Sequence, residues 1–151
     1  MRVALTDHID RSPDKQLLRG RIGTIHSWVL DKDEDSTAQH GKRPLKKLPR
    51  VVFVKFLDAE GGELPWRLNG LTENGLYPIV PRKRTWYLDK NRKYPKLSIS
   101  RQQLPLAPAY AITAHASQGQ TLEDGAIVDL SIGKGTSPIS NYVALLVCRL
   151  E

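Results

Sequence analysis

Short apolar runs, set between polar turn-forming residues, fill the first part of the chain. Runs rich in β-branched and aromatic residues predict strands at residues 2–6, 21–30, 50–57, 64–68, 76–80 and 84–88. The clearest is the VVFVKF run that begins at Val51, and the Ala-Glu-Gly-Gly sequence after it, at 59–62, predicts a tight turn. Several short strands joined by Gly- and Pro-containing turns are typical of a small β-barrel.

One segment in this region is poor in apolar residues. Residues 31–48 are first acidic and then basic, and they include Gly and Pro. Such a sequence buries too little apolar surface to order itself, so it predicts a long exposed loop.

The last part of the chain has a different pattern. Compact apolar runs at 109–113 and 125–130 predict two buried strands, and 114–124 between them predicts a loop with one or two helical turns. Ser137-Pro138 is typical of a helix start, and 140–149 continues that helix. Strand, turn, strand and helix form an α/β pattern, so we expect an α/β fold that carries a β-rich insertion.

The positive charge of the chain is concentrated in its middle. Lys and Arg outnumber Asp and Glu by fifteen to five in residues 41–101, whereas the flanking segments are slightly acidic. A localised basic field attracts polyanions through counterion release, which favours nucleic acid as the partner. A solvated basic face that keeps a protein soluble has the same composition, so charge alone does not decide between them.

Composition argues against several other classes. No apolar run reaches the roughly 18 residues of a membrane-spanning helix, and the N-terminal residues do not form a signal peptide. The single cysteine, Cys148, excludes an internal disulfide and fits a reducing compartment, and the four scattered histidines have no metal-ligand spacing. We therefore expect an intracellular protein without a membrane partner or a metal site, in the nucleus, a mitochondrion or the cytoplasm.

The machinery of nucleotide hydrolysis is missing from this sequence. The nearest string to a Walker A loop, Gly-Lys-Gly-Thr at 133–136, lacks the upstream glycine and separates the lysine from the hydroxyl. Asp129 is followed by Leu130 rather than by a second acid, and no carboxylate is indicated to orient His115 toward Ser117. We expect no catalytic residue and no bound cofactor in this chain alone.

Small polar residues cluster after the predicted 109–113 strand, at the edge where open α/β sheets bind ligands. An ordinary polar turn has the same residue types. The stretch resembles motif V of the Pif/RecD-like branch of superfamily-one DNA helicases, which it matches at Arg101, Gln102, Pro105, Leu106, Ala109, Ala111, Thr113, His115, Ser117, Gln118, Gly119, Thr121 and Leu122. The Tyr-Val-Ala-Leu sequence at 142–145 is similar to the opening of motif VI, and residues 1–20 are similar to the family's strand before its barrel.

The resemblance implies a fold and a set of roles. It implies a partial RecA-like second domain of the P-loop NTPase type: its first strand and turn at 1–18, an SH3-like β-barrel insertion at 19–101, and the remainder with motifs V and VI at 102–151. It places single-stranded DNA against Thr113, His115, Ser117 and Gln118. It places Gly119, Thr121 and Arg149 near the nucleotide, which in the family is ATP with magnesium.

Departures from the family pattern imply a loss of activity. Ala116 replaces the usual lysine after the histidine, and Leu146-Val147 replaces the Ser/Thr-Arg pair of motif VI. That arginine normally stabilises charge on the transferring phosphate. We expect ATP hydrolysis to need a separate chain that supplies the first RecA-like domain.

Aromatic residues alternate with cations in the basic middle. Residues 82–101 carry eight Lys and Arg with Trp86, Tyr87 and Tyr94 among them, and bases stack on such rings while cations follow phosphates. We expect DNA contacts from Arg84, Trp86, Arg92 and Lys93. The alternative is a core role, which is expected for at least one of Trp86 and Tyr87 because strand neighbours face opposite ways. Trp28 and Trp66 are expected in the core.

These observations support three hypotheses. The first is a helicase-derived chain that binds single-stranded DNA and cannot hydrolyse ATP alone. The second is a stand-alone basic β-barrel that binds a protein partner or RNA, and salt-insensitive binding would favour the protein partner. The third is a decayed chain that does not fold independently, because so few strands leave exposed sheet edges.

Overall fold

The computed structural model describes residues 1–34, 45–89, 91, 93, 94, 97–113, 127, 128 and 142. The chain divides into two compact units, Met1–Ala109 and Tyr110–Glu151. The strands of the described residues lie in the first unit: β1 (Arg2–Leu5), β2 (Ile22–Val29), β3 (Val51–Lys55), β4 (Leu76–Ile79), β5 (Arg82–Tyr87), β6 (Ser98–Gln103) and β7 (Leu106–Pro108). The described residues are thus β-rich, and Tyr142 is helical among them.

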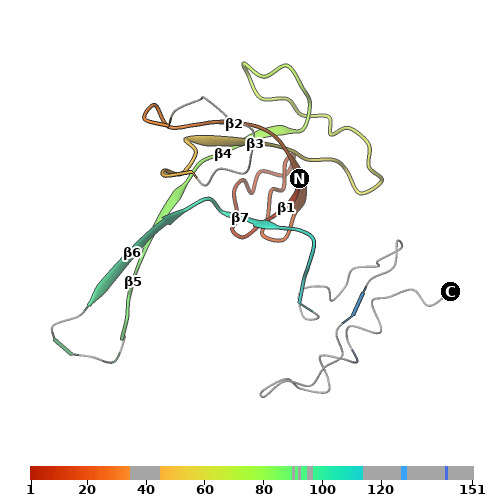
Figure 1. Ribbon diagram of the computed structural model, residues 1–151. Coiled ribbons are helices and arrows are strands. Elements are labelled where there is room, and N and C mark those ends of the chain that lie inside the picture. The colour runs from red at the N-terminus through yellow and green to blue at the C-terminus, as the bar shows by residue number, and fades with distance from the viewer. Residues whose placement is uncertain are drawn as a thin grey trace. The chain divides into compact units, whose positions relative to one another are not determined.

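The first unit contains two antiparallel sheets (Figure 1). Five strands form a sheet in the order β4-β3-β2-β1-β7, and β5 and β6 form a separate two-stranded sheet. The last strand of the unit returns to pair with the first, with Val3 opposite Pro108 and Leu5 opposite Leu106. The five-stranded sheet therefore brings both ends of the unit together.

Alternation along β3 decides which residues form the core. Val52 and Val54 are buried while their strand neighbours are partly exposed, as the two-residue period of a strand requires. Phe56 is fully buried directly after the strand. Around these residues the core cluster is completed by Val3, Leu5, Leu17, Trp66 and Ile79.

One of the two predicted core tryptophans is in the core. Trp66 is 7% exposed and packs edge-to-face against Tyr77, with ring centroids 6.2 Å apart. The prediction for Trp28 is wrong, because this residue is 59% exposed. It lies one residue from the end of β2, after a register shift between Ile25 and Ser27, and the core cluster does not extend that far.

A loop between β1 and β2 is fixed to the sheet. Leu17, which belongs to this loop, is fully buried in the core, and the Ile9 N–H donates to the Leu17 carbonyl at 2.8 Å. The Tyr77 hydroxyl on β4 donates to Asp10 at 3.2 Å. Residues 6–21 therefore hold a defined position beside the sheet.

Most of the predicted strands are present, and two are wrong. Residues 64–68 are not a strand, because the tight turn is closed by a single bridge between Leu57 and Glu63 and the chain then departs to bury Trp66. Residues 109–113 are not a strand either. Beyond Pro108 the Ala109 N–H still donates to the carbonyl of Arg2 at 3.1 Å, and the pairing then ends because β1 begins at Arg2.

The remaining expectations fall partly outside the described residues. Residues 31–34 and 45–48 lie outside strands and helices, as expected for the long loop, whereas 35–44 are not described. The backbone N–H of Lys47 donates to the buried Glu34 carboxylate at 2.7 Å and ties the two sides of the loop together. Of the predicted 125–130 strand only Ile127 and Val128 are described, and neither is in a strand.

Candidate nucleic-acid interface

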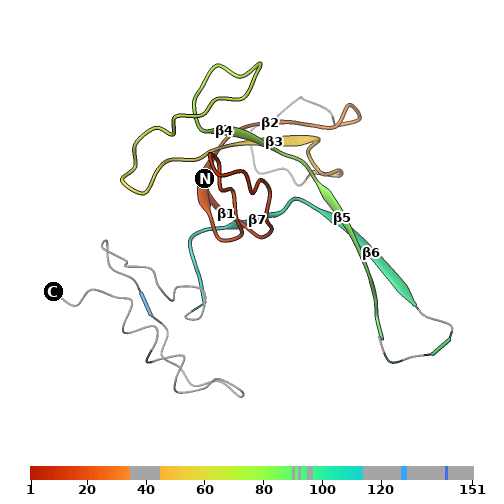
Figure 2. The same cartoon turned by 180° about the vertical axis from the view of Figure 1, so that it is seen from behind.

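The hairpin made by β5 and β6 projects from the five-stranded sheet as a narrow ribbon (Figures 1 and 2). Its ladder runs from Arg82 opposite Gln103 to Tyr87 opposite Ser98, and the Leu88 N–H extends it by donating to the Leu97 carbonyl. Every residue of the two strands is exposed except Arg82 and Ile99, which are partly buried. A ribbon that is open on both faces contributes little to the core and is available for binding.

The register sorts the hairpin into two chemically different faces, because residues directly opposite each other share a face. We call the first the arginine face, and it contains Arg82, Arg84, Trp86, Ile99, Arg101 and Gln103. We call the second the hydroxyl face, and it contains Lys83, Thr85, Tyr87, Ser98, Ser100 and Gln102. Guanidinium groups are thus gathered on one side only.

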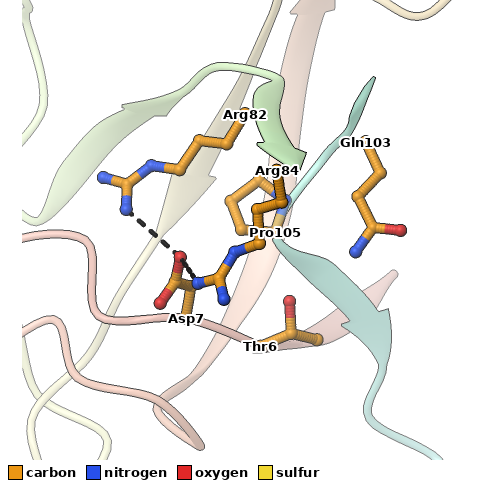
Figure 3. Close-up of a pocket in the computed structure, with 6 residues that line it drawn as sticks. All are labelled: Thr6, Asp7, Arg82, Arg84, Gln103 and Pro105. Carbon is orange, nitrogen blue, oxygen red and sulfur yellow. Dashed lines mark hydrogen bonds and ion pairs between the residues drawn. The ribbon is translucent and has the colours of Figure 1, made fainter. Parts of the chain in front are cut away.

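Asp7 anchors the root of the arginine face to the rest of the unit (Figure 3). Arg84 and Arg82 both donate hydrogen bonds to Asp7 Oδ2, and the bond from Arg82 is 3.4 Å long. Arg82 also donates to the His8 carbonyl at 3.0 Å. The hydrogen bond from Arg84 holds the pKa of the Asp7 carboxyl below its usual value, and the charge of Arg82 adds to this effect. Because Asp7 belongs to the 6–21 loop, these contacts tie the root of the hairpin to that loop.

A small pocket of about 150 Å³ opens beside this ion cluster (Figure 3). It is lined by Thr6, Asp7, Arg82, Arg84, Gln103 and Pro105. The lining is polar and cationic, which suits an anion better than an apolar ligand.

The aromatic residues of the hairpin are exposed. Trp86 is 43% exposed, Tyr87 49% and Tyr94, beyond the ladder, 87%. The expectation that Trp86 or Tyr87 fills the core is therefore wrong, because no strand pairs with the hairpin beyond its own two among the residues that the structure describes. Exposed rings beside cations are the arrangement on which single-stranded bases stack.

Some cations elsewhere on the unit form ion pairs. Lys55 lies 2.8 Å from Glu73 and 3.4 Å from Glu63, and His26 lies 3.1 Å from Glu73. By contrast, Lys83, Lys93 and Arg101 make no ion pair with another described residue. The hairpin therefore presents cations that have no ion pair among the described residues together with exposed aromatic rings.

The structure brings together some of the predicted site residues and leaves others untested. Arg84 and Trp86 share the arginine face, and Lys93 is exposed near the tip. Thr113 is exposed. The other predicted residues lie outside the described residues: Arg92, His115, Ser117, Gln118, Gly119, Thr121 and Arg149.

Three residues of the site were missed from the sequence. Arg101 and Gln103 lie two apart, so a strand prediction for 98–103 would have placed them on one face, but Ser-Ile-Ser-Arg-Gln-Gln has little apolar alternation. Asp7 carries no local signal, because its partners are 75 and 77 residues away in the chain. Within the described part of the chain, no three His, Cys, Asp or Glu side chains converge as metal ligands, and no helix is long and apolar enough to cross a membrane.

The fold and the hairpin together define a β-rich module with an exposed basic ribbon. No family model matches the sequence. The chain is 33% identical over 124 residues to the ATP-dependent DNA helicase PIF7 of Trypanosoma brucei brucei, covering 80% of this chain and 12% of that protein. It is also 33% identical over 139 residues to the ATP-dependent DNA helicase PIF1 of Danio rerio, covering 92% of this chain and 19% of that protein.

The chain is thus a relative of the Pif-type ATP-dependent DNA helicases, as its motif V predicted. It spans 12% and 19% of the lengths of these two curated relatives.

Proposed function

We propose that this chain is the part of a Pif-type DNA helicase that binds single-stranded DNA, and that it does not hydrolyse ATP by itself. One observation carries the proposal. This chain, which is related to Pif-type helicases, has cations without an ion pair among the described residues and exposed aromatic rings on a projecting hairpin. Cations attract the phosphates, and rings such as Trp86 stack on the bases without regard to sequence.

For the fold we propose an SH3-like barrel attached to part of a RecA-like domain. An SH3-like barrel is a five-stranded antiparallel unit whose last strand pairs with its first, and the order β4-β3-β2-β1-β7 agrees with that arrangement. The β5–β6 hairpin would then be an insertion between the last two barrel strands. The RecA-like part, with motif V from Thr113 onward, rests on the sequence resemblance.

The sequence supports the proposed lack of ATPase activity in this chain alone. It has no Walker A loop, and Leu146-Val147 stand where motif VI has its arginine. ATP and magnesium would therefore need a first RecA-like domain from elsewhere, and this chain's own residues contribute DNA contacts.

Salt dependence tests the proposed binding. The affinity of the chain for an unstructured oligothymidylate is measured by fluorescence anisotropy, and if four phosphates are neutralised it should fall about 50-fold between 50 and 200 mM salt. Affinity that stays flat across this range would contradict a phosphate-directed interface and favour a protein partner.

A further inference from the structure

The arginine face concentrates like charges at its root. In the ladder, Arg82 lies opposite Gln103, Arg84 opposite Arg101, and Trp86 opposite Ile99. Like charges directly opposite each other destabilise a strand pair. Among the described residues Asp7 is the one carboxylate that pairs with any of these guanidinium groups, and it pairs with Arg82 and Arg84 but not with Arg101, so the group keeps an excess of positive charge.

Hydrogen-bond donors at this root are left over. An arginine side chain has five N–H donors, of which Arg84 uses one on Asp7, and the Arg101 guanidinium makes no hydrogen bond with another described residue. Thr6 and Gln103 line the adjacent pocket, and their side chains make no hydrogen bond within the described part of the chain. Guanidinium, hydroxyl and amide groups that converge on a small open pocket are the donors that bind phosphate.

We infer that the root of the arginine face is a phosphate subsite. Arg84, Thr6 and Gln103 line its pocket, and Arg101, which lies opposite Arg84 in the ladder and does not line the pocket, adds a second guanidinium on the same face. Asp7 acts there as an internal anion that holds Arg84 in place and competes with the incoming phosphate. The inference deepens the proposed function and rests on it, because it assigns one backbone phosphate to named residues. The same chemistry fits a free phosphate ion.

Two variants with the same loss of charge test the subsite. Arg101→Gln removes a donor of the arginine face, whereas Lys83→Gln removes one charge from the hydroxyl face one step along β5 from Arg84. Loss of one screened phosphate contact weakens oligothymidylate binding about fivefold at 0.1 M salt, which is the result expected for Lys83→Gln. Arg101→Gln should weaken it about tenfold or more, because the planar fork binds two phosphate oxygens, and Arg101→Lys should recover only part of the loss.

Asp7→Asn distinguishes a competing anion from a simple anchor. Removal of the carboxylate should strengthen oligothymidylate binding about threefold to fivefold at 0.1 M salt, because one fewer anion competes for Arg84. Weaker binding by Asp7→Asn would overturn the inference, since Asp7 would then serve only to hold the hairpin. Equal effects of Arg101→Gln and Lys83→Gln would overturn it as well.

The source of the phosphate is decided by two probes, inorganic phosphate and an oligothymidylate without terminal phosphates. If Arg101→Gln weakens the binding of oligothymidylate but not of inorganic phosphate, the subsite binds a phosphodiester. If Arg101→Gln weakens the binding of both probes, the subsite binds any phosphate group. If the wild-type chain binds inorganic phosphate through Arg101 but not DNA, the proposed function fails while the subsite stands. If the chain binds DNA but Arg101→Gln and Lys83→Gln have equal affinities for each probe, the inferred subsite is wrong while the proposed function stands.

Discussion

Replacing Lys83, Lys93 and Arg101 together with glutamine is expected to weaken oligothymidylate binding about 100-fold at 0.1 M salt. Each of these cations is exposed on the hairpin and is without an ion pair among the described residues. For single-stranded DNA, each lost phosphate contact lowers the slope of log affinity against log salt concentration by about 0.7, so three lost contacts lower it by about 2. At 0.1 M salt this corresponds to a loss of about two orders of magnitude in affinity. Anisotropy titrations at several salt concentrations measure both the affinity and the slope.

A second triple variant with the same net charge is the control. Lys15, Lys47 and Lys55 are each ion-paired, to Asp14, Asp33 and Glu73 respectively. Their replacement with glutamine removes three positive charges from outside the hairpin, and exposed pairs contribute only about 0–1 kcal/mol to stability. This variant should lose less than about fivefold in affinity. If both triples weaken binding equally, overall charge rather than the hairpin drives it, and the alternative of a solvated basic face is correct.

Replacing Phe56 with alanine is expected to lower the free energy of unfolding by about 3–5 kcal/mol. Phe56 is fully buried, follows β3 directly and belongs to the single core cluster of the described unit. Its backbone N–H donates to the Gly75 carbonyl at 2.8 Å, and a Cβ on Gly75 would lie 2.4 Å from the Phe56 carbonyl oxygen. The backbone therefore has little freedom to collapse into the cavity that truncation leaves. Urea denaturation followed by circular dichroism measures the loss.

Two further variants keep this prediction decisive. Leu57→Ala, at the next residue, truncates a side chain that is 41% exposed and should lose less than about 1 kcal/mol. Phe56→Leu removes less volume and keeps the protein measurable if Phe56→Ala does not fold. A loss in Phe56→Ala no larger than in Leu57→Ala would show that the chain has no specific core, as the hypothesis of a decayed chain expects.

The strands that the sequence predicts correctly are those with strong local patterns. The VVFVKF run alternates buried and partly exposed side chains in β3, and β2 and β4 each contain β-branched and aromatic residues. The polar strand β6 escapes prediction because its stability comes from pairing with β5 rather than from its own side chains. The apolar residues at 109–113 have the sequence pattern of a strand, but among the described residues no strand pairs with them, since β1 pairs with Leu106–Pro108 instead.

The candidate site was predictable only in its composition. The basic and aromatic residues of the hairpin follow from the sequence, as does the choice of Arg84 and Trp86. The exposure of both Trp86 and Tyr87 does not, because it depends on how far the hairpin projects. The role of Asp7 does not either, because contacts across 75 residues are set by the register of the whole sheet.

The measurement that tests the central claim most directly follows the fluorescence of Trp86 as single-stranded DNA is added. In a Trp28→Phe chain the remaining tryptophans are the buried Trp66 and the exposed Trp86, whereas a Trp86→Phe chain keeps Trp66 and the exposed Trp28, which lies on β2 in the five-stranded sheet. Bases stacked on the hairpin should quench the Trp28→Phe chain in a saturable, salt-sensitive way and leave the Trp86→Phe chain unchanged. Quenching confined to the Trp86→Phe chain, or no quenching of either while DNA is bound, would show that the hairpin is not the DNA-binding surface.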